Sequence, residues 1–179
     1  MPAELGGPPG DVGSHCLYMA EHLIGSRIRS LACTYLLATL GLAVENGAFV
    51  QFETAGGVQG SARVAFTQPR GGQRGTLGNL GYEIYGSEGV LRGYGTLFQL
   101  SGYSDEPVAV RLELDRIRRV EPVRVRRIHN VYQALIQAHA DSIRENRPMD
   151  GGEGLHNLEL VLKCHESARG RGKRVTLKG

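Results

Sequence analysis

The chain has 179 residues, of which 41% are hydrophobic and 22% charged, with 26 glycines, no tryptophan and a net charge of +3. This length and composition suit one compact, loop-rich domain and exclude a chain that is disordered over most of its length. No apolar run approaches the roughly 18 residues that a membrane-spanning helix requires, and the N-terminus lacks the pattern of a signal peptide. We therefore expect a cytoplasmic protein that does not act at a membrane.

The first predicted elements are an irregular lead-in and a short helix. Residues 1–10 are rich in glycine and proline, which favours an irregular and flexible backbone, so we expect the domain itself to span residues 11–179. Helical spacing of apolar residues begins after Ser14, with Asp11 or Ser14 as candidate N-cap and Gly25 as the candidate end. The apolar residues at this spacing are Leu17, Ala20, Leu23 and Ile24.

A period of two follows the first helix and predicts a largely antiparallel sheet. The alternation, interrupted by a glycine-rich loop over residues 69–78, indicates strands over residues 27–37, 48–54, 58–66, 82–85, 90–94 and 108–114. In the third of these strands, apolar and polar side chains fall on opposite faces, which leaves one face without a helix to cover it. Such an open face favours assembly into at least a dimer.

The C-terminal part returns to a helical period. Apolar residues at helical spacing predict helices from 128 to 148 and from 154 to 169, and a last short strand covers residues 174–177. The sequence therefore predicts an α+β fold, with an open, largely antiparallel sheet of about six strands and helices packed on one face.

One pair of residues at the entrance of the first helix has the chemistry for proton transfer. Asp11 and His15 are four residues apart, which brings two side chains to neighbouring positions one helical turn apart. An imidazole can take up or release a proton near neutral pH, and a carboxylate beside it can orient it. The alternative is that Asp11 caps the helix and His15 is a partly buried helix residue; spacing alone favours this alternative.

The stretch around this pair resembles the start of the C-terminal domain of the Gfo/Idh/MocA family of nicotinamide-dependent sugar oxidoreductases. The family pattern is Asp, any residue, Gly, any residue, His, and then a helix that ends in Leu and Gly, as from Asp11 to Gly25 here. Further similar segments follow in the family's order, and together they cover nearly the whole chain. They are the hairpin 83–91, the helix end 143–148, the closing helix 154–169 and the strand 174–177.

The resemblance implies a function and roles for two residues. His15 would be the catalytic acid/base that exchanges a proton with a substrate hydroxyl, and Asp11 would support the substrate and His15. The implied cofactor is NAD or NADP, the implied substrate is a sugar or polyol, and the implied assembly is a homo-oligomer through the exposed sheet face. Tyr18 departs from the pattern, because many members carry an aspartate three residues after the His.

The resemblance also implies a nucleotide-binding Rossmann domain, for which we find no counterpart in these residues. The nearest glycine-rich candidate, Gly75, Gly78 and Gly81, opens no predicted helix and so offers no cradle for a pyrophosphate. We therefore expect no cofactor-binding residue in this chain and no activity of the chain alone. The alternative is a non-catalytic module that binds a ligand or dimerises, either truncated or partnered with a separate nucleotide-binding subunit.

Three other groups of residues favour structural interpretations. Cys164 and His165 are adjacent on a helix, so their side chains point about 100° apart and do not suit a nucleophile and its base. We expect both to have packing roles and all three cysteines to be free thiols. Asp11, His15 and His22 lack the spacing of a metal site, so we expect no metal. Six arginines lie between residues 116 and 127, without interleaved aromatic residues that could stack on bases. We therefore expect them to line the solvent face of an edge strand, with Glu121 and Asp115 as ionic partners, and we expect no binding of nucleic acid.

Overall fold

The computed structural model shows two compact units. The first comprises residues 1–68 and 150–179, so both ends of the chain contribute to it, and the second comprises residues 69–149. No helix in the part of the chain that the structure describes has the length and apolar character needed to cross a membrane. The described residues are 7–36, 41, 43–66, 81–95, 110–116, 118–125 and 131–177.

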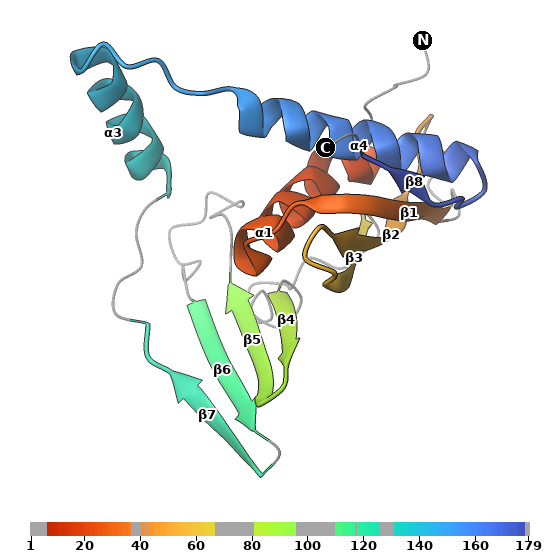
Figure 1. Ribbon diagram of the computed structural model, residues 1–179, viewed down its shortest axis with the longest axis horizontal. Helices are drawn as coiled ribbons and strands as arrows, with labels where there is room; N and C mark the ends of the chain where they lie inside the picture. The colour runs from red at the N-terminus through yellow and green to blue at the C-terminus, as the bar shows by residue number, and fades with distance from the viewer. Residues whose placement is uncertain are drawn as a thin grey trace. The chain divides into compact units, whose positions relative to one another are not determined.

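The first unit is a four-stranded antiparallel sheet with two helices packed on it (Figure 1). The strands lie in the order β3-β2-β1-β8, and the C-terminal strand β8 pairs with β1 at Ser30 and Leu31. The elements are η1 (Pro9–Gly13), α1 (Ser14–Ile24), β1 (Ile28–Leu36), β2 (Gly47–Thr54), β3 (Gln59–Ala65), α4 (Gly152–Arg169) and β8 (Val175–Thr176).

The core of the first unit lies between one face of this sheet and the helices α1 and α4. Strand alternation turns one set of side chains toward the helices, where apolar burial stabilises the packing. The opposite face exposes Thr34, Phe49, Gln51 and Arg63. The buried apolar residues include Leu17 from α1, Leu31, Cys33, Val50, Phe52 and Val64 from the sheet, and Leu160 and Cys164 from α4.

The first helix confirms its predicted end and corrects its predicted start. Gly25 follows α1 with a φ of 71°, a conformation that glycine adopts at little cost, and its N–H donates to Glu21 O. The start lies earlier than either candidate cap, Asp11 or Ser14, because the π-helical turn η1 begins at Pro9, within the predicted irregular lead-in 1–10, and runs directly into α1. Pro9 is compatible with this position, because the first helical turn does not need its missing N–H.

The second unit is another four-stranded antiparallel sheet, in the order β4-β5-β6-β7, followed by one helix. The predicted hairpin is confirmed as β4 (Gly81–Gly86) and β5 (Gly89–Gly95), and it is followed by β6 (Val110–Arg116), β7 (Arg119–Val123) and α3 (Val131–Arg144). The α+β class with open antiparallel sheets is thus confirmed, although the strands belong to two sheets and not to one. The predicted loop 69–78 lies outside the described residues.

Helix α3 differs from its predicted packing. Its apolar residues Leu135, Ile136 and Ile143, which the helical period predicts to face inward, are 59%, 69% and 67% exposed. A period of 3.6 identifies the apolar face of a helix, but it does not identify the element that covers this face.

Candidate functional site

Asp11 and His15 both lie exposed on the helical segment that opens the first unit. Asp11 belongs to the π-helical turn η1 and His15 to the first turn of α1, so the two follow each other by one turn of continuous helix. The hydroxyl of Ser14 donates to Asp11 O at 2.8 Å, which supports the backbone at the transition between the two helix types. A π-helical turn is rare in proteins and is frequent at functional sites.

The opposite face of the segment explains why these two side chains point to solvent. Gly13 is buried, and a Cβ at this position would lie 3.3 Å from Pro8 O and 3.7 Å from Val64 Cγ2, so glycine allows the segment to pack closely against β3. One turn later Leu17 is 1% exposed in the core. The packed face thus fixes the rotation of the helix and presents Asp11 and His15 outward.

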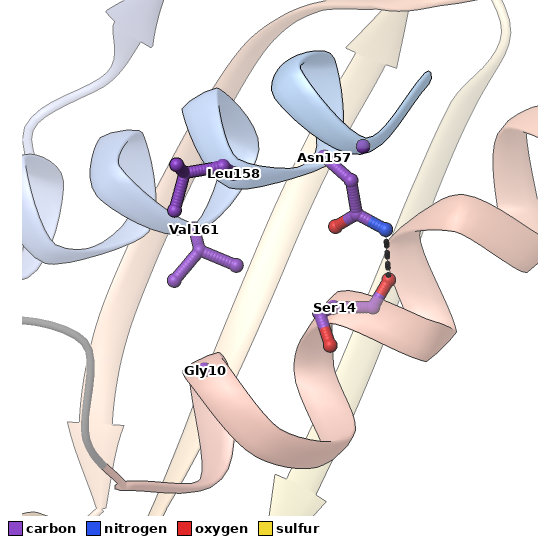
Figure 2. Close-up of a pocket in the computed structure, with 6 residues that line it drawn as sticks. Gly10, Ser14, Asn157, Leu158 and Val161 are labelled. Atoms are coloured by element: carbon purple, nitrogen blue, oxygen red, sulfur yellow. Dashed lines mark hydrogen bonds between the residues drawn. The ribbon is translucent and has the colours of Figure 1, made fainter. Parts of the chain in front are cut away.

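A contact with α4 fixes the first turn of α1. Asn157 Nδ2 donates to Ser14 O at 3.2 Å, and Asn157 Oδ1 is buried with no partner among the described residues (Figure 2). Beside this contact lies a pocket of about 300 Å³, bounded by Gly10 and Ser14 on one side and by Leu158 and Val161 on the other. This contact holds the first turn of α1, which carries His15, against α4, as the fixed geometry of a proton-transfer site requires.

Sequence reasoning missed an aromatic pair on the same helix. Tyr18, noted only as a departure from the family pattern, lies beside His22, with ring centroids 6.4 Å apart and ring planes inclined by 11°. At 3.6 residues per turn, His15, Tyr18 and His22 lie within about 60° of one another around α1. The spacing of four residues between Tyr18 and His22 was the signal that could have identified the pair.

A buried carboxylate joins α1 to the start of β1 and to α4. Glu21, 9% exposed, accepts the Ile28 N–H at 2.6 Å and lies 2.8 Å from His156 Nε2. Burial of a carboxylate is costly unless hydrogen bonds compensate it, and these two do so. Glu21 therefore holds the elements that surround the candidate site.

Cys164 and His165 have separate partners in the core. The Cys164 thiol interacts with Cys33 of β1, and this hydrogen bond, together with burial, raises the pKa of Cys164. His165 Nδ1 bonds to the hydroxyl of Tyr35, and burial lowers the pKa of His165. Burial and the nearby Glu45 carboxylate raise the pKa of Tyr35 to about 12. Both residues of the adjacent pair are thus packed, and all three cysteines are free thiols.

The N-terminus of α4 does not fit a dinucleotide. The N-terminus of α4 carries two carboxylates, because Asp150 Oδ1 accepts the Gly152 N–H at 2.9 Å and Glu153 lies in the first turn. A pyrophosphate needs free N–H groups and no anion at such a position. Gly81 opens β4 and not a helix, while Gly75 and Gly78 lie outside the described residues.

The arginine cluster from residue 116 to 127 and the possible metal ligands were the two other groups considered in the sequence. Arg119 of β7 pairs with Glu121 as expected, whereas the partner that the described residues show for Asp115 is Arg92 of β5. Among the described residues no group of three or more His, Cys, Asp or Glu side chains is placed to hold a metal ion. Arg126 and Arg127 lie outside the described residues.

Comparison with known proteins gives one family match and several similar folds. The model of the GFO/IDH/MocA C-terminal domain matches residues 1–92, slightly more than half of the 179 residues. No match was found among curated protein sequences.

Three solved structures illustrate the similarity in fold. An aldose-aldose oxidoreductase from Caulobacter crescentus, solved with glycerol, is 16% identical with a TM-score of 0.72 over 96% of this chain and 48% of that chain. An oxidoreductase from Agrobacterium radiobacter, solved with NAD+, L-tartaric acid and magnesium, is 20% identical with a TM-score of 0.67 over 96% and 51%. The WlbA dehydrogenase from Bordetella pertussis, solved with NADH and UDP-GlcNAcA, is 21% identical with a TM-score of 0.61 over 97% and 46%. This chain thus spans about half the length of each.

Proposed function

Because this chain belongs to the GFO/IDH/MocA family as a C-terminal domain, we propose that it forms the substrate-binding half of an NAD(P)-dependent oxidoreductase acting on a sugar or polyol. The observation that carries the proposal is the exposed pair Asp11 and His15, one turn apart on a helix whose other face is fixed in the core. The NAD+ and the NADH bound in two structures of similar fold support the cofactor class.

In this function His15 is the general acid/base, and Asp11 binds the substrate and orients the imidazole of His15. When the substrate is oxidised, the proton of the reacting hydroxyl passes to the imidazole of His15, and in the reverse direction the imidazole returns it. Because the N-terminus of α4 does not fit a dinucleotide and the family resemblance places the nucleotide on a separate Rossmann domain, we assign to Asp11 and His15 only substrate binding and proton transfer.

The test joins this chain to a nucleotide-binding domain of the family and measures reduction of NAD+ or NADP+ with a panel of sugars and polyols. His15→Ala should lower turnover by about 10²–10⁴, the usual contribution of a general acid/base group. Because the His15 side chain is exposed, the midpoint of thermal unfolding should stay nearly the same. His139→Ala, an exposed histidine of α3, is the matched control and should leave turnover unaffected.

Two results would contradict this assignment. A His15→Ala fusion that is destabilised and fully active would remove His15 from the active site and return it to the packed helix residue that spacing alone favours. A wild-type fusion that binds ligand or dimerises but never reduces the cofactor would indicate the alternative, a non-catalytic module. The chain alone should give no saturable change in NADH fluorescence, and micromolar binding would overturn that expectation.

We also propose that the exposed face of the first unit's sheet forms a homo-oligomer. This face carries Phe49 among polar residues, and Phe49 is 36% exposed. Light scattering at tens of micromolar should give at least a dimer, and Phe49→Asp should shift the population toward the monomer. Tyr85→Asp, at a 73% exposed aromatic residue of β4, is the control that should not. A wild-type monomer would contradict the proposal.

A further inference from the structure

A polar pocket lies where α1 ends, apart from the pocket beside Ser14. Its volume is about 310 Å³, and Tyr18, His22, Arg27 and Glu153 lie around it, together with the buried Glu21. Sequence reasoning assigned no role to Tyr18, Arg27 or Glu153. All of these residues belong to the first unit, so one compact body supplies the pocket.

One side of the pocket is aromatic. The rings of Tyr18 and His22 are nearly parallel, inclined by only 11°, and Tyr18 is 44% exposed. Aromatic rings bury a large apolar area while the Tyr hydroxyl and the imidazole keep hydrogen-bonding groups at their edges. Such a pair suits a flat ring that carries C–H groups on its face and polar groups around its rim.

The charges of the pocket favour a neutral ligand. Arg27 forms an ion pair with Glu153, and Glu21 is the second carboxylate of the lining, so an anion would meet two carboxylates and one guanidinium. A hydroxyl group both donates and accepts a hydrogen bond, whereas a carboxylate only accepts and a guanidinium only donates. Arg27 and Glu153 side by side can therefore bind neighbouring hydroxyls, and they are exposed enough to do so, at 49% and 57%.

The pocket lies along α1 from the proposed catalytic residue. His15, Tyr18 and His22 share one face of the helix, and at 1.5 Å per residue His22 follows His15 by about 10 Å. A ligand whose reacting hydroxyl faces His15 can therefore extend toward Tyr18 and His22.

We infer that this pocket is a second binding site, for a neutral polyhydroxylated ring, which holds the part of the substrate that does not react while His15 faces the reacting hydroxyl. The inference rests on the proposed function for its link to His15. Its binding chemistry rests on the pocket residues Tyr18, His22, Arg27 and Glu153 and on the carboxylate of Glu21, and not on His15.

The test measures binding to the full 179-residue chain, without cofactor, by saturation-transfer NMR. The probes are D-glucose, myo-inositol and maltose as neutral compounds, and D-glucuronate as the anionic counterpart of glucose. At least one neutral probe should bind saturably and more tightly than glucuronate. Tyr18→Ala should weaken that binding at least tenfold, Tyr18→Phe should retain most of it, and Arg27→Gln should weaken it too. Tyr85→Ala is the control outside the pocket, and circular dichroism checks that each variant is folded.

The outcomes separate this inference from the proposed function. The inference is overturned if none of the neutral probes binds, if glucuronate binds more tightly than glucose, or if folded Tyr18→Ala and Arg27→Gln bind as the wild type does. The role of His15 has its own readout, which is the turnover of the fused enzyme. If a neutral probe binds as expected to the pocket and the His15→Ala fusion is nevertheless fully active, the proposed role of His15 fails while the pocket stands.

Discussion

The two units of this chain differ in how they are stabilised. In the first unit, residues from three strands and two helices are buried to 0–4% exposure, whereas among the described residues of the second unit only Gly93 is buried. The second unit is built from strand pairing and from exposed or half-exposed ion pairs such as Arg92 with Glu83 and Asp115. The comparison teaches that the candidate site stands on the densely packed unit, where a helix is held in one orientation.

The largest expected effect is the loss of a core side chain in the first unit. Leu160 of α4 is fully buried, so Leu160→Ala leaves a cavity and should lower the free energy of unfolding by about 2–5 kcal/mol. Leu114→Ala in β6 is the matched substitution in the second unit and should cost less than half as much, because Leu114 is only half-buried. Urea unfolding of both variants measures the difference, and equal losses would abolish the contrast between the units.

A second, smaller effect is expected at the buried carboxylate. Glu21→Ala removes the acceptor of the buried Ile28 N–H and should destabilise the protein by about 1–3 kcal/mol. Glu83→Ala removes a carboxylate of the second unit that is 46% exposed, and it should change stability by about 0.5 kcal/mol at most. Thermal unfolding of the two variants compares them. A larger loss in Glu83→Ala would show that ion pairs carry more of the stability than burial does.

The third effect concerns the pH dependence of the first unit. Burial lowers the pKa of His165 below its ordinary value of 6.5, so as the pH falls through 6.5 the unfolded chain binds a proton that the folded chain does not. Stability should therefore decrease from pH 6.5 downward until the lowered pKa of His165 is reached, and His165→Gln should flatten this decrease. His139→Gln, exposed on α3, should leave the slope unchanged. The measurement is chemical unfolding from pH 8 to pH 5; an unaltered slope in His165→Gln would contradict it.

The smallest effect is expected in the ion pairs of the second unit. Arg92 hydrogen bonds to Glu83 and thereby lowers the pKa of that carboxyl. Arg92→Gln should raise the pKa of Glu83 toward its ordinary value, while the unfolding of the first unit stays the same. An NMR titration of the Glu83 side chain follows the shift. No shift would mean that the pair at the protein surface is not maintained in solution.

The sequence predicted the local elements well because their signals are local. The alternation around Val50 and Phe52, the turn at Gly57 and the helix end at Gly25 each depend on a few neighbouring residues, and each agrees with the structure within one or two residues. The division of the strands into two sheets was not predicted, because it depends on pairings such as that of Leu31 with Val175, far apart in the chain.

The candidate site was predicted in part for the same reason. Asp11 and His15 are close in sequence, and a motif can identify them, although their catalytic roles stay a prediction. The pocket at the end of α1 brings Arg27 together with Glu153, and no pattern along the chain signals this contact. The π-helical turn at Asp11 was also missed, because two prolines and three glycines within residues 6–10 indicated irregular backbone, whereas the close packing of Gly13 against β3 is a tertiary contact that no local pattern signals.

The pairing of β8 with β1 has a consequence for synthesis of the protein on the ribosome. Leu31 is paired with Val175, so one edge of β1 has no partner strand until residues 175 and 176 have left the exit tunnel. At about 5–20 residues per second this interval lasts roughly 7–30 s. During it the hairpin of the second unit, whose pairings are all nearby in sequence, can already form. The edge of β1 therefore stays unpaired for most of translation, and it lies in the unit that holds the candidate site. Chaperone binding during translation is expected to concentrate on β1.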